Sequence, residues 1–202
     1  MRTMRKFTSL DELPTAQQFR KELRRRRYKK MFAATLKNTF VSVVNAAAVL
    51  VLLSFLFLPA VRVTGTSMEP NLSGNEIVLC SKIRQAKRGD IIALYYNKKI
   101  LLKRVIAVTG DVIDIDENGT VQLTGKRLDE PYIKEAALGE CDITFPYTVK
   151  ENRWFVMGDN RASSVDSRYS AFGCVPDENI LGVVWFRLYP FDRPHLPVKP
   201  DA

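Results

Sequence analysis

The sequence predicts a mainly β fold, with one N-terminal transmembrane helix followed by a β-rich domain that carries a small cap region. Three observations favour it. Residues 40–58 contain no charged side chain; short alternating, β-branched segments follow them; and Asn118-Gly119 lies between two of these segments, which is a strong hairpin signal. At 202 residues with 46% hydrophobic content, the chain can bury one good core. We therefore expect the strands to cover one another in a small barrel or folded sheet.

The N-terminal residues 1–38 carry the whole excess of positive charge. They hold 12 Lys and Arg against 3 Asp and Glu, so the remaining basic and acidic residues of the chain balance. The β-rich part therefore offers no basic face for a phosphate backbone, and no nucleic-acid partner is expected. Such a segment is either a solvated, partly helical tail or a basic cytoplasmic arm beside a membrane, and the apolar run that follows favours the arm.

The apolar run predicts a transmembrane helix over residues 39–58. Nineteen residues at about 1.5 Å each span roughly 28 Å, which is close to the thickness of the hydrocarbon core of a bilayer. A buried core helix would be shorter and would show a polar stripe, and a cleavable signal peptide would have a shorter apolar run. Positive charge before the span places the N-terminus in the cytoplasm and residues 60–202 outside it, in the cell membrane of a single-pass protein.

The β-rich domain is expected to cover residues 60–189, with a hairpin and cap insertion over about 112–152. Candidate strands are residues 76–80, 90–96, 100–108, 112–116, 120–123, 153–157 and 182–188. Residues 124–152 look less regular and are assigned to the cap. The Pro-rich tail, 190–202, is expected to be extended and peripheral.

The sequence holds no motif for a metal or a cofactor. Cys80, Cys141 and Cys174 do not show metal-ligand spacing, and there is no glycine-rich phosphate loop. We expect the three cysteines to be buried small hydrophobes, although a disulfide between two of them stays open. Neither a metal nor a cofactor is therefore expected.

A serine in a turn-prone hexapeptide, Gly65-Thr66-Ser67-Met68-Glu69-Pro70, follows the apolar run closely. Such residues also cluster in ordinary surface turns. A serine hydroxyl becomes a good nucleophile only when a base takes its proton, and the usual base is histidine. The only histidine is His195, in the C-terminal tail, so a lysine kept neutral by burial is the alternative base.

Lys103 is the candidate for that base. Alternation in its strand places Lys103 on one face with Leu101, Val105 and Ala107, among apolar neighbours that would lower its pKa towards about 7 or 8. The alternative is an edge lysine whose head group reaches solvent.

A polar loop at residues 158–168 supplies possible partners for the amine. It could be simply a solvated loop. However, a buried amine needs hydrogen-bond partners, and the hydroxyl of Ser164 could orient it without restoring its charge. Four further residues of the loop could form ion pairs that fix it: Asp159, Arg161, Asp166 and Arg168.

The chain resembles the type I signal peptidases, which are membrane-bound serine proteases. The resemblance rests on GTSMEP, on RGDIIALYY at 88–96, on KRVIAVTGD at 103–111 and on GDNRASSVDSR at 158–168. It implies a Ser-Lys dyad in a β-rich fold shared with self-cleaving repressors, with Ser67 as nucleophile and Lys103 as general base. It also implies that Ser164 and Asp166 support the lysine, while Asp159, Arg161 and Arg168 maintain the loop.

The resemblance further implies an acyl-enzyme mechanism without a cofactor, acting at the lipid bilayer on the signal peptides of secreted preproteins. Small residues should precede the cut, as in the A-x-A pattern, and substrate should bind near Met68 and Pro70. The alternatives are an inactive membrane-tethered β-domain that serves in binding or assembly, and a self-cleaving regulator.

Two positions depart from the family pattern. Gly65 stands where some members have a hydroxyl residue that donates to the oxyanion, so the Ser67 backbone N–H is the one donor expected here. Asn71 stands where threonine is common, and we expect this change to affect the local turn more than the chemistry.

Overall fold

A computed structural model describes residues 15–191. Most of the C-terminal tail that was expected to be extended, with His195, lies outside these residues. The described chain separates into two compact units, divided between Leu53 and Ser54. Within the described residues, the regular structure of the second unit is almost entirely β-strand, and the long helix lies mostly in the first unit. The mainly β fold with one N-terminal apolar helix is therefore confirmed.

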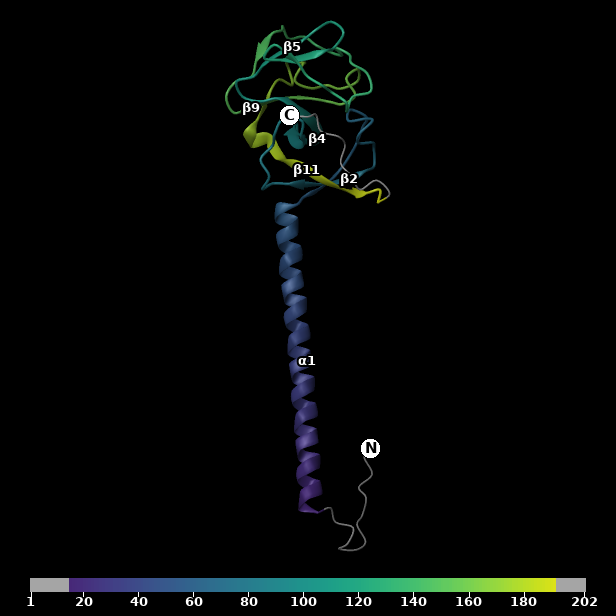
Figure 1. The fold of residues 1–202 in the computed structure, drawn as a ribbon, viewed down its shortest axis with the longest axis vertical. Helices are drawn as coiled ribbons and strands as arrows, with labels where there is room; N and C mark the ends of the chain where they lie inside the picture. The colour runs from purple at the N-terminus through teal and green to yellow at the C-terminus, as the bar shows by residue number, and fades with distance from the viewer. Residues whose placement is uncertain (1–14, 192–202) are drawn as a thin grey trace. The chain divides into compact units, whose positions relative to one another are not determined.

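The helix α1 covers Ala16–Phe57 (Figure 1). It contains neither Gly nor Pro, which would interrupt a helix, and Pro59 lies two residues after its last residue, Phe57. By length and composition it could cross a membrane, and its apolar side chains, such as Phe40 and Leu52, are exposed. The helix begins at Ala16, well before the predicted start near residue 39, because the basic segment has good helix formers and pairs such as Glu22 with Arg26.

The strands of the second unit form two antiparallel sheets. The larger has the order β1-β2-β11-β3-β4-β9-β10 and the smaller the order β7-β6-β5-β8. Their bounds are β1 Ala60–Arg62, β2 Ile77–Ser81, β3 Ile91–Tyr96, β4 Lys99–Ala107, β5 Val112–Ile115, β6 Val121–Leu123, β7 Lys126–Arg127, β8 Tyr147–Thr148, β9 Arg153–Met157, β10 Val175–Pro176 and β11 Ile180–Tyr189. A short 3₁₀ turn, Asp177–Asn179, precedes β11. All seven predicted strands are present, and the four that were missed have two or three residues each.

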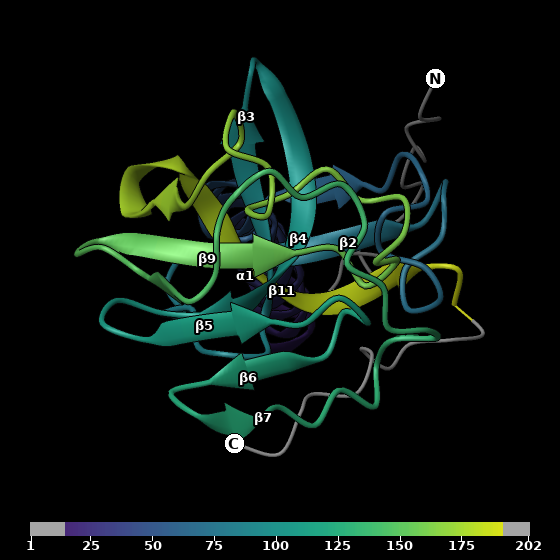
Figure 2. The same ribbon diagram turned by 90° about the horizontal axis from the view of Figure 1, so that it is seen from above.

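Strand β4 lies inside the larger sheet, where it pairs with β3 on one side and β9 on the other (Figure 2). Six consecutive residues from Leu102 to Ala107 are buried, so both faces of this strand are covered. The turn between β3 and β4 uses Asn97 and Lys98 at positive φ, as tight hairpins require. A side chain in the second half of β4 is therefore shielded from solvent whichever way it points.

The smaller sheet lies within residues 112–148, where the sequence predicts the hairpin and cap. Its hairpin β5–β6 pairs Ile115 with Val121 around Asn118-Gly119, and Gly119 has φ +81°, so the predicted hairpin is confirmed. Apolar residues of this sheet share a core with Phe155 and Met157 of β9. The cap sheet is thus packed on the strand that enters the 158–168 loop.

All three cysteines are free. Cys80 and Cys174 are buried, as expected, and burial raises the pKa of the Cys80 thiol to about 12. Cys141 is only half-buried. The prediction for Cys141 is therefore wrong, because it lies in an irregular part of the cap outside the two sheets.

Candidate active site

Ser67 lies in a turn whose neighbouring side chains are buried. The Glu69 N–H donates to the Thr66 carbonyl at 3.1 Å, and the Leu72 N–H donates to the Met68 carbonyl at 2.9 Å. Met68 and Leu72 are fully buried and belong to the core cluster beneath β2 and β4. Ser67 itself is partly exposed. The turn is therefore fixed from the core side while its serine faces outward.

Gly65 has φ +86°, a left-handed conformation that side chains rarely adopt. No atom lies within 4 Å of the position that a Cβ would take there. Backbone conformation, and not lack of space, therefore explains why this chain has glycine where some family members have a hydroxyl residue.

Lys103 is the buried lysine that the sequence predicts. Its side chain is 3% exposed, and its Nζ donates to the Ser164 Oγ at 2.6 Å. Burial lowers the pKa of the Lys103 ammonium to about 8, although the carboxylates of Asp166 and Asp159 oppose that effect. The predicted burial and the predicted contact with Ser164 are both present. Their roles in catalysis stay predictions.

Gly158 packs against both the Ser67 backbone and the side chain of Ser164, which is the hydrogen-bond partner of Lys103. A Cβ built on Gly158 would lie 2.2 Å from the Ser164 Oγ and 2.5 Å from the Ser67 carbonyl oxygen. The Asn160 N–H also donates to that carbonyl at 3.1 Å. Within residues 15–191, no hydrogen bond joins Ser67 to Lys103 directly. The polar loop therefore contacts both the turn that carries Ser67 and the side chain of Lys103. Hydrogen bonds between catalytic groups are often long in sites without substrate.

Asp166 and Arg168 form a fully buried ion pair inside the loop, with Arg168 Nε 2.8 Å from Asp166 Oδ1. The Gly158 N–H donates to Asp166 Oδ2 at 2.9 Å. Burial alone would raise the pKa of the Asp166 carboxyl, but hydrogen bonds and charge from Arg168 hold it below its usual value. Asp166 is therefore an anion that fixes both ends of the loop near Lys103.

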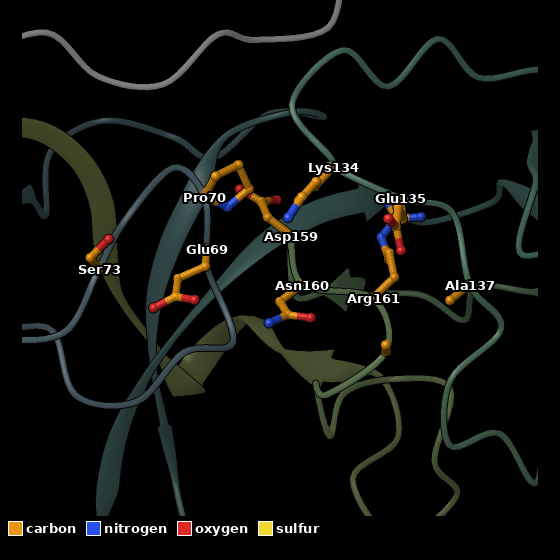
Figure 3. A pocket seen from close by; sticks show the side chains of 10 residues that line it. Glu69, Pro70, Ser73, Lys134, Glu135, Ala137, Asp159, Asn160 and Arg161 are labelled. Carbon is orange, nitrogen blue, oxygen red and sulfur yellow. The ribbon is translucent and has the colours of Figure 1, made fainter.

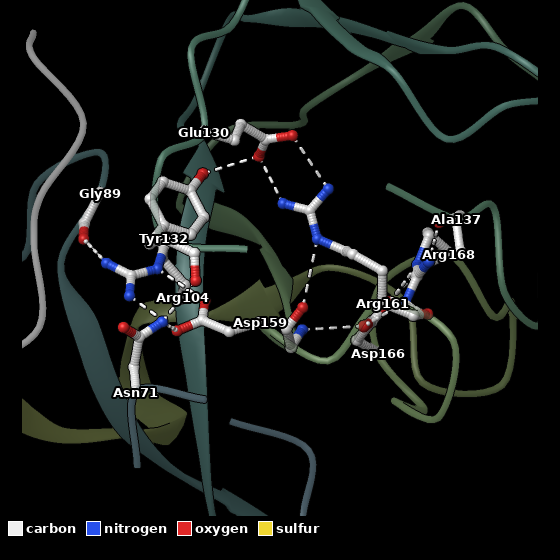
Figure 4. Close-up of polar contacts among 11 residues, drawn as sticks. Asn71, Gly89, Arg104, Glu130, Tyr132, Ala137, Asp159, Arg161, Asp166 and Arg168 are labelled. Atoms are coloured by element: carbon white, nitrogen blue, oxygen red, sulfur yellow. Dashed lines mark hydrogen bonds and ion pairs between the residues drawn. The ribbon is translucent and has the colours of Figure 1, made fainter. Parts of the chain in front are cut away.

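The other two charged residues of the loop pair with partners outside it (Figure 4). Asp159 accepts two hydrogen bonds from Arg104, each of 2.7 Å, and both side chains are 1% exposed. Arg161 pairs with Glu130 of the cap. The prediction that the four charged residues of the loop form ion pairs is thus confirmed, although the partners of Asp159 and Arg161 come from β4 and the cap.

Sequence reasoning missed the contribution of Asn71, Arg104 and Tyr132. The Asn71 Nδ2 donates to Asp159 Oδ2 at 2.8 Å and to the Tyr132 carbonyl at 2.6 Å, and the Arg104 guanidinium lies 3.9 Å from the centre of the Tyr132 ring. Asn71 thus connects the turn that carries Ser67 to the loop and the cap. Its contribution is therefore not confined to the turn, as the sequence had suggested. One sequence signal for this network was available. Arg104 is a charged residue inside an apolar strand, and a buried charge requires a partner.

Two pockets adjoin the turn that carries Ser67. The small pocket, about 30 Å³, is lined by Arg62, Val63, Thr64, Gly65, Ser67, Met68, Ile100, Leu101 and Leu102. The large pocket, about 490 Å³, is lined by Glu69, Pro70, Ser73, Lys134, Glu135, Ala137, Asp159, Asn160, Arg161 and Ala162. Ser67 and Met68 therefore line the small pocket, and Pro70 lines the large one.

Comparisons with known proteins show the family to which the chain is similar. The family described as signal peptidase, peptidase S26, matches residues 36–189. Signal peptidase I S of Bacillus subtilis is 34% identical over 163 residues, which cover 75% of this chain and 87% of that protein. Signal peptidase I of Bacillus licheniformis is 35% identical over 169 residues, covering 76% and 89% respectively. A crystal structure of a signal peptidase I from Enterococcus faecalis, 30% identical, covers 50% of this chain and 98% of that chain with a TM-score of 0.42.

Proposed function

Because the chain belongs to the signal peptidase family, peptidase S26, we propose that it removes N-terminal signal peptides from exported preproteins by a Ser67–Lys103 dyad. The family is one of serine peptidases, and the chain is accordingly a serine endopeptidase of the signal peptidase I type. The dyad, the acyl-enzyme and the membrane topology are the parts that we propose.

One observation carries the proposal, which is the buried amine of Lys103. With a pKa of about 8, roughly a tenth of the amine is neutral at pH 7, whereas an ordinary lysine with a pKa of about 10.4 has almost none. An inactive binding module would have no need for a desolvated amine beside a serine turn. The tethered, inactive β-domain is therefore the less favoured reading.

The acylation step follows from these groups. Neutral Lys103 Nζ accepts the proton of the Ser67 hydroxyl while the oxygen attacks the scissile carbonyl carbon. The resulting oxyanion accepts a hydrogen bond from the Ser67 backbone N–H. When the C–N bond breaks, the Lys103 ammonium gives its proton to the leaving amine, and the acyl group stays on Ser67 as an ester.

Deacylation uses the same groups in turn. Lys103, neutral again, takes a proton from water as the water oxygen attacks the ester carbon. The ester C–O bond breaks and the Ser67 oxygen recovers a proton from the lysine. Throughout both steps the Ser164 hydroxyl, 2.6 Å from Nζ, supports the direction of the amine.

The small pocket supports a preference for small residues before the cut. It is lined partly by the apolar side chains of Val63, Met68 and Leu102, and a volume of about 30 Å³ has no room for a large side chain. A substrate with a small residue at this point, as in the A-x-A pattern of signal peptides, would fit beside Ser67.

The membrane topology is also part of the proposal. The basic residues before the apolar run place the N-terminus in the cytoplasm, and residues 60–189 form the catalytic domain outside the membrane. From Leu58 to Ser67 the chain can extend at most about 32 Å. The nucleophile would then lie near the bilayer surface, where the cleavage site of a signal peptide emerges.

The test uses the purified full chain in detergent with a labelled preprotein. Wild type should cleave it, and Ser67→Ala and Lys103→Met should each lose at least a thousandfold in kcat/KM. Ser163→Ala, at an exposed serine that lines neither pocket, serves as a folded control for the serine change. Cleavage at the wild-type rate by either dyad variant would overturn the assignment.

A further inference from the structure

The large pocket is a polar cavity beside the turn that carries Ser67, and Glu69 and Pro70 of that turn line it. Its side chains come from three segments: residues 69–73, 134–137 and 159–162 (Figure 3). We propose that this pocket binds the first residues after the cut, and that its acidic side chains favour basic over acidic residues there. The inference rests on the proposed function, because it names the part of the substrate that this second pocket takes.

The pocket directly adjoins the reacting serine. Glu69 follows Ser67 by two positions, and Asn160 binds the serine turn twice, through its N–H to the Ser67 carbonyl at 3.1 Å and through its Nδ2 to the Thr66 carbonyl at 3.3 Å. Both Glu69 and Asn160 line the large pocket. A polypeptide bound across Ser67 would therefore pass beside this cavity.

The proton transfer identifies which half of the substrate enters it. The leaving amine has to come within hydrogen-bond reach of Lys103 Nζ, and Nζ is bonded to Ser164 of the 158–168 loop. Residues 159–162 of that same loop form one wall of the large pocket. The leaving half, which is the start of the mature protein, therefore lies on the side of the large pocket.

The shape and charge of the pocket suit that half. About 490 Å³ holds several residues of varied type, unlike the small pocket. Asp159 and Arg161 are already paired with Arg104 and Glu130. Across residues 15–191 no ion pair involves the three remaining charges, which belong to Glu69, Lys134 and Glu135. The carboxylates of Glu69 and Glu135 outnumber the ammonium of Lys134, so these three side chains give the pocket a net negative charge.

The experiment compares two preproteins that are identical except for the two residues after the cut, Lys-Lys in one and Glu-Glu in the other. The full chain in detergent is assayed for kcat/KM as wild type, as Glu69→Lys and as Glu151→Lys. Glu151 is exposed and does not line the pocket. A second pocket variant, Glu135→Lys, guards against a local folding defect in the first.

Wild type should favour the Lys-Lys preprotein by about two- to fivefold, the size of exposed charge effects, and less at 1 M salt. Glu69→Lys and Glu135→Lys should each remove or invert that preference, and Glu151→Lys should keep it. Equal cleavage of both preproteins by wild type, or an unchanged preference in both pocket variants, would overturn the inference while the proposed function stands. No cleavage of either preprotein by wild type would instead overturn the proposed function itself.

Discussion

The amine nitrogen of Lys103 lies 2.6 Å from the hydroxyl oxygen of Ser164, and both side chains are buried. Lys103 comes from β4, an interior strand of the larger sheet, whereas Ser164 comes from the polar loop after β9. A short bond between such distant segments fixes the direction of the amine. It does so without adding charge, so the low pKa that burial gives to Lys103 is kept.

Replacing Ser164 by Ala should therefore lower kcat by about 10- to 100-fold with little change in KM. The change removes a hydrogen bond to a group that is charged in part of the cycle, which is worth about 1.5–3 kcal/mol. The measurement is steady-state cleavage of a preprotein. Ser163→Ala is the matched control, because Ser163 is exposed and should behave as wild type. Equal losses in both variants would contradict the role given to Ser164.

The activity should rise with pH up to about 8 and then level. Only the neutral amine of Lys103 can accept the proton of Ser67, and its pKa is about 8. Below that pH, kcat/KM should fall about tenfold per unit, since the neutral fraction falls by that factor. A profile that stays flat between pH 6 and 9 would exclude Lys103 as the base.

The stability should depend on pH through the same residue. The pKa of Lys103 is about 8 in the folded chain and near 10.5 when the chain is unfolded. Between these values the unfolded chain binds more protons at this position, so the free energy of unfolding contributed by Lys103 rises with pH. Relative to Lys103→Met, wild type should gain about 3 kcal/mol from pH 8 to 10.5, at about 1.36 kcal/mol per pKa unit.

Other groups that titrate in this pH range contribute equally to wild type and to Lys103→Met, so their effects cancel in the difference between the two free energies of unfolding. Denaturant unfolding in detergent at several pH values measures the difference. A constant difference between wild type and Lys103→Met would mean that the amine is solvated in the folded state.

Replacing Gly158 by Ala should reduce both stability and activity. The Cβ of an alanine at position 158 would lie 2.2 Å from the Ser164 Oγ and 2.5 Å from the Ser67 carbonyl oxygen. The loop and the turn that carries Ser67 would therefore have to move apart. We expect a loss of about 1–3 kcal/mol, typical of overpacking, and at least a tenfold fall in kcat. Gly74→Ala is the control, because its Cβ would meet only an ordinary contact of 3.8 Å. Equal behaviour of the two alanine variants would contradict this account of the loop.

The sequence was informative wherever local pattern determines structure. Alternation predicted the long strands, Asn118-Gly119 predicted a hairpin, and the apolar setting of Lys103 predicted its burial, all of which the structure contains. Short strands such as β8 and β10 were missed because two residues carry no periodic signal. They exist because a neighbouring strand supplies their hydrogen bonds.

The partners of buried charges were harder to predict, because they depend on which segments meet in space. The sequence predicted an ion pair for Asp159 but did not identify its partner, which is Arg104, 55 residues earlier in the chain. Similarly, Asn71 contacts Asp159 and Tyr132 from a turn far away in sequence. Sequence could indicate that Arg104 needs a partner, but only the fold determines which one.

The Arg104–Asp159 pair leads to the last prediction, which separates buried from exposed charge pairs. Its two side chains are each 1% exposed, whereas Arg88 pairs with Asp111 at 2.8 Å with 44% of its side chain exposed. Arg104→Met leaves the Asp159 carboxylate buried without its guanidinium, which should cost about 3–5 kcal/mol. Arg88→Met should cost less than about 1 kcal/mol, since solvent screens that pair. Denaturant unfolding of both variants measures the contrast. Similar small losses would mean that the Asp159 carboxylate reaches water, and the network in Figure 4 would then not be what fixes the loop beside Lys103.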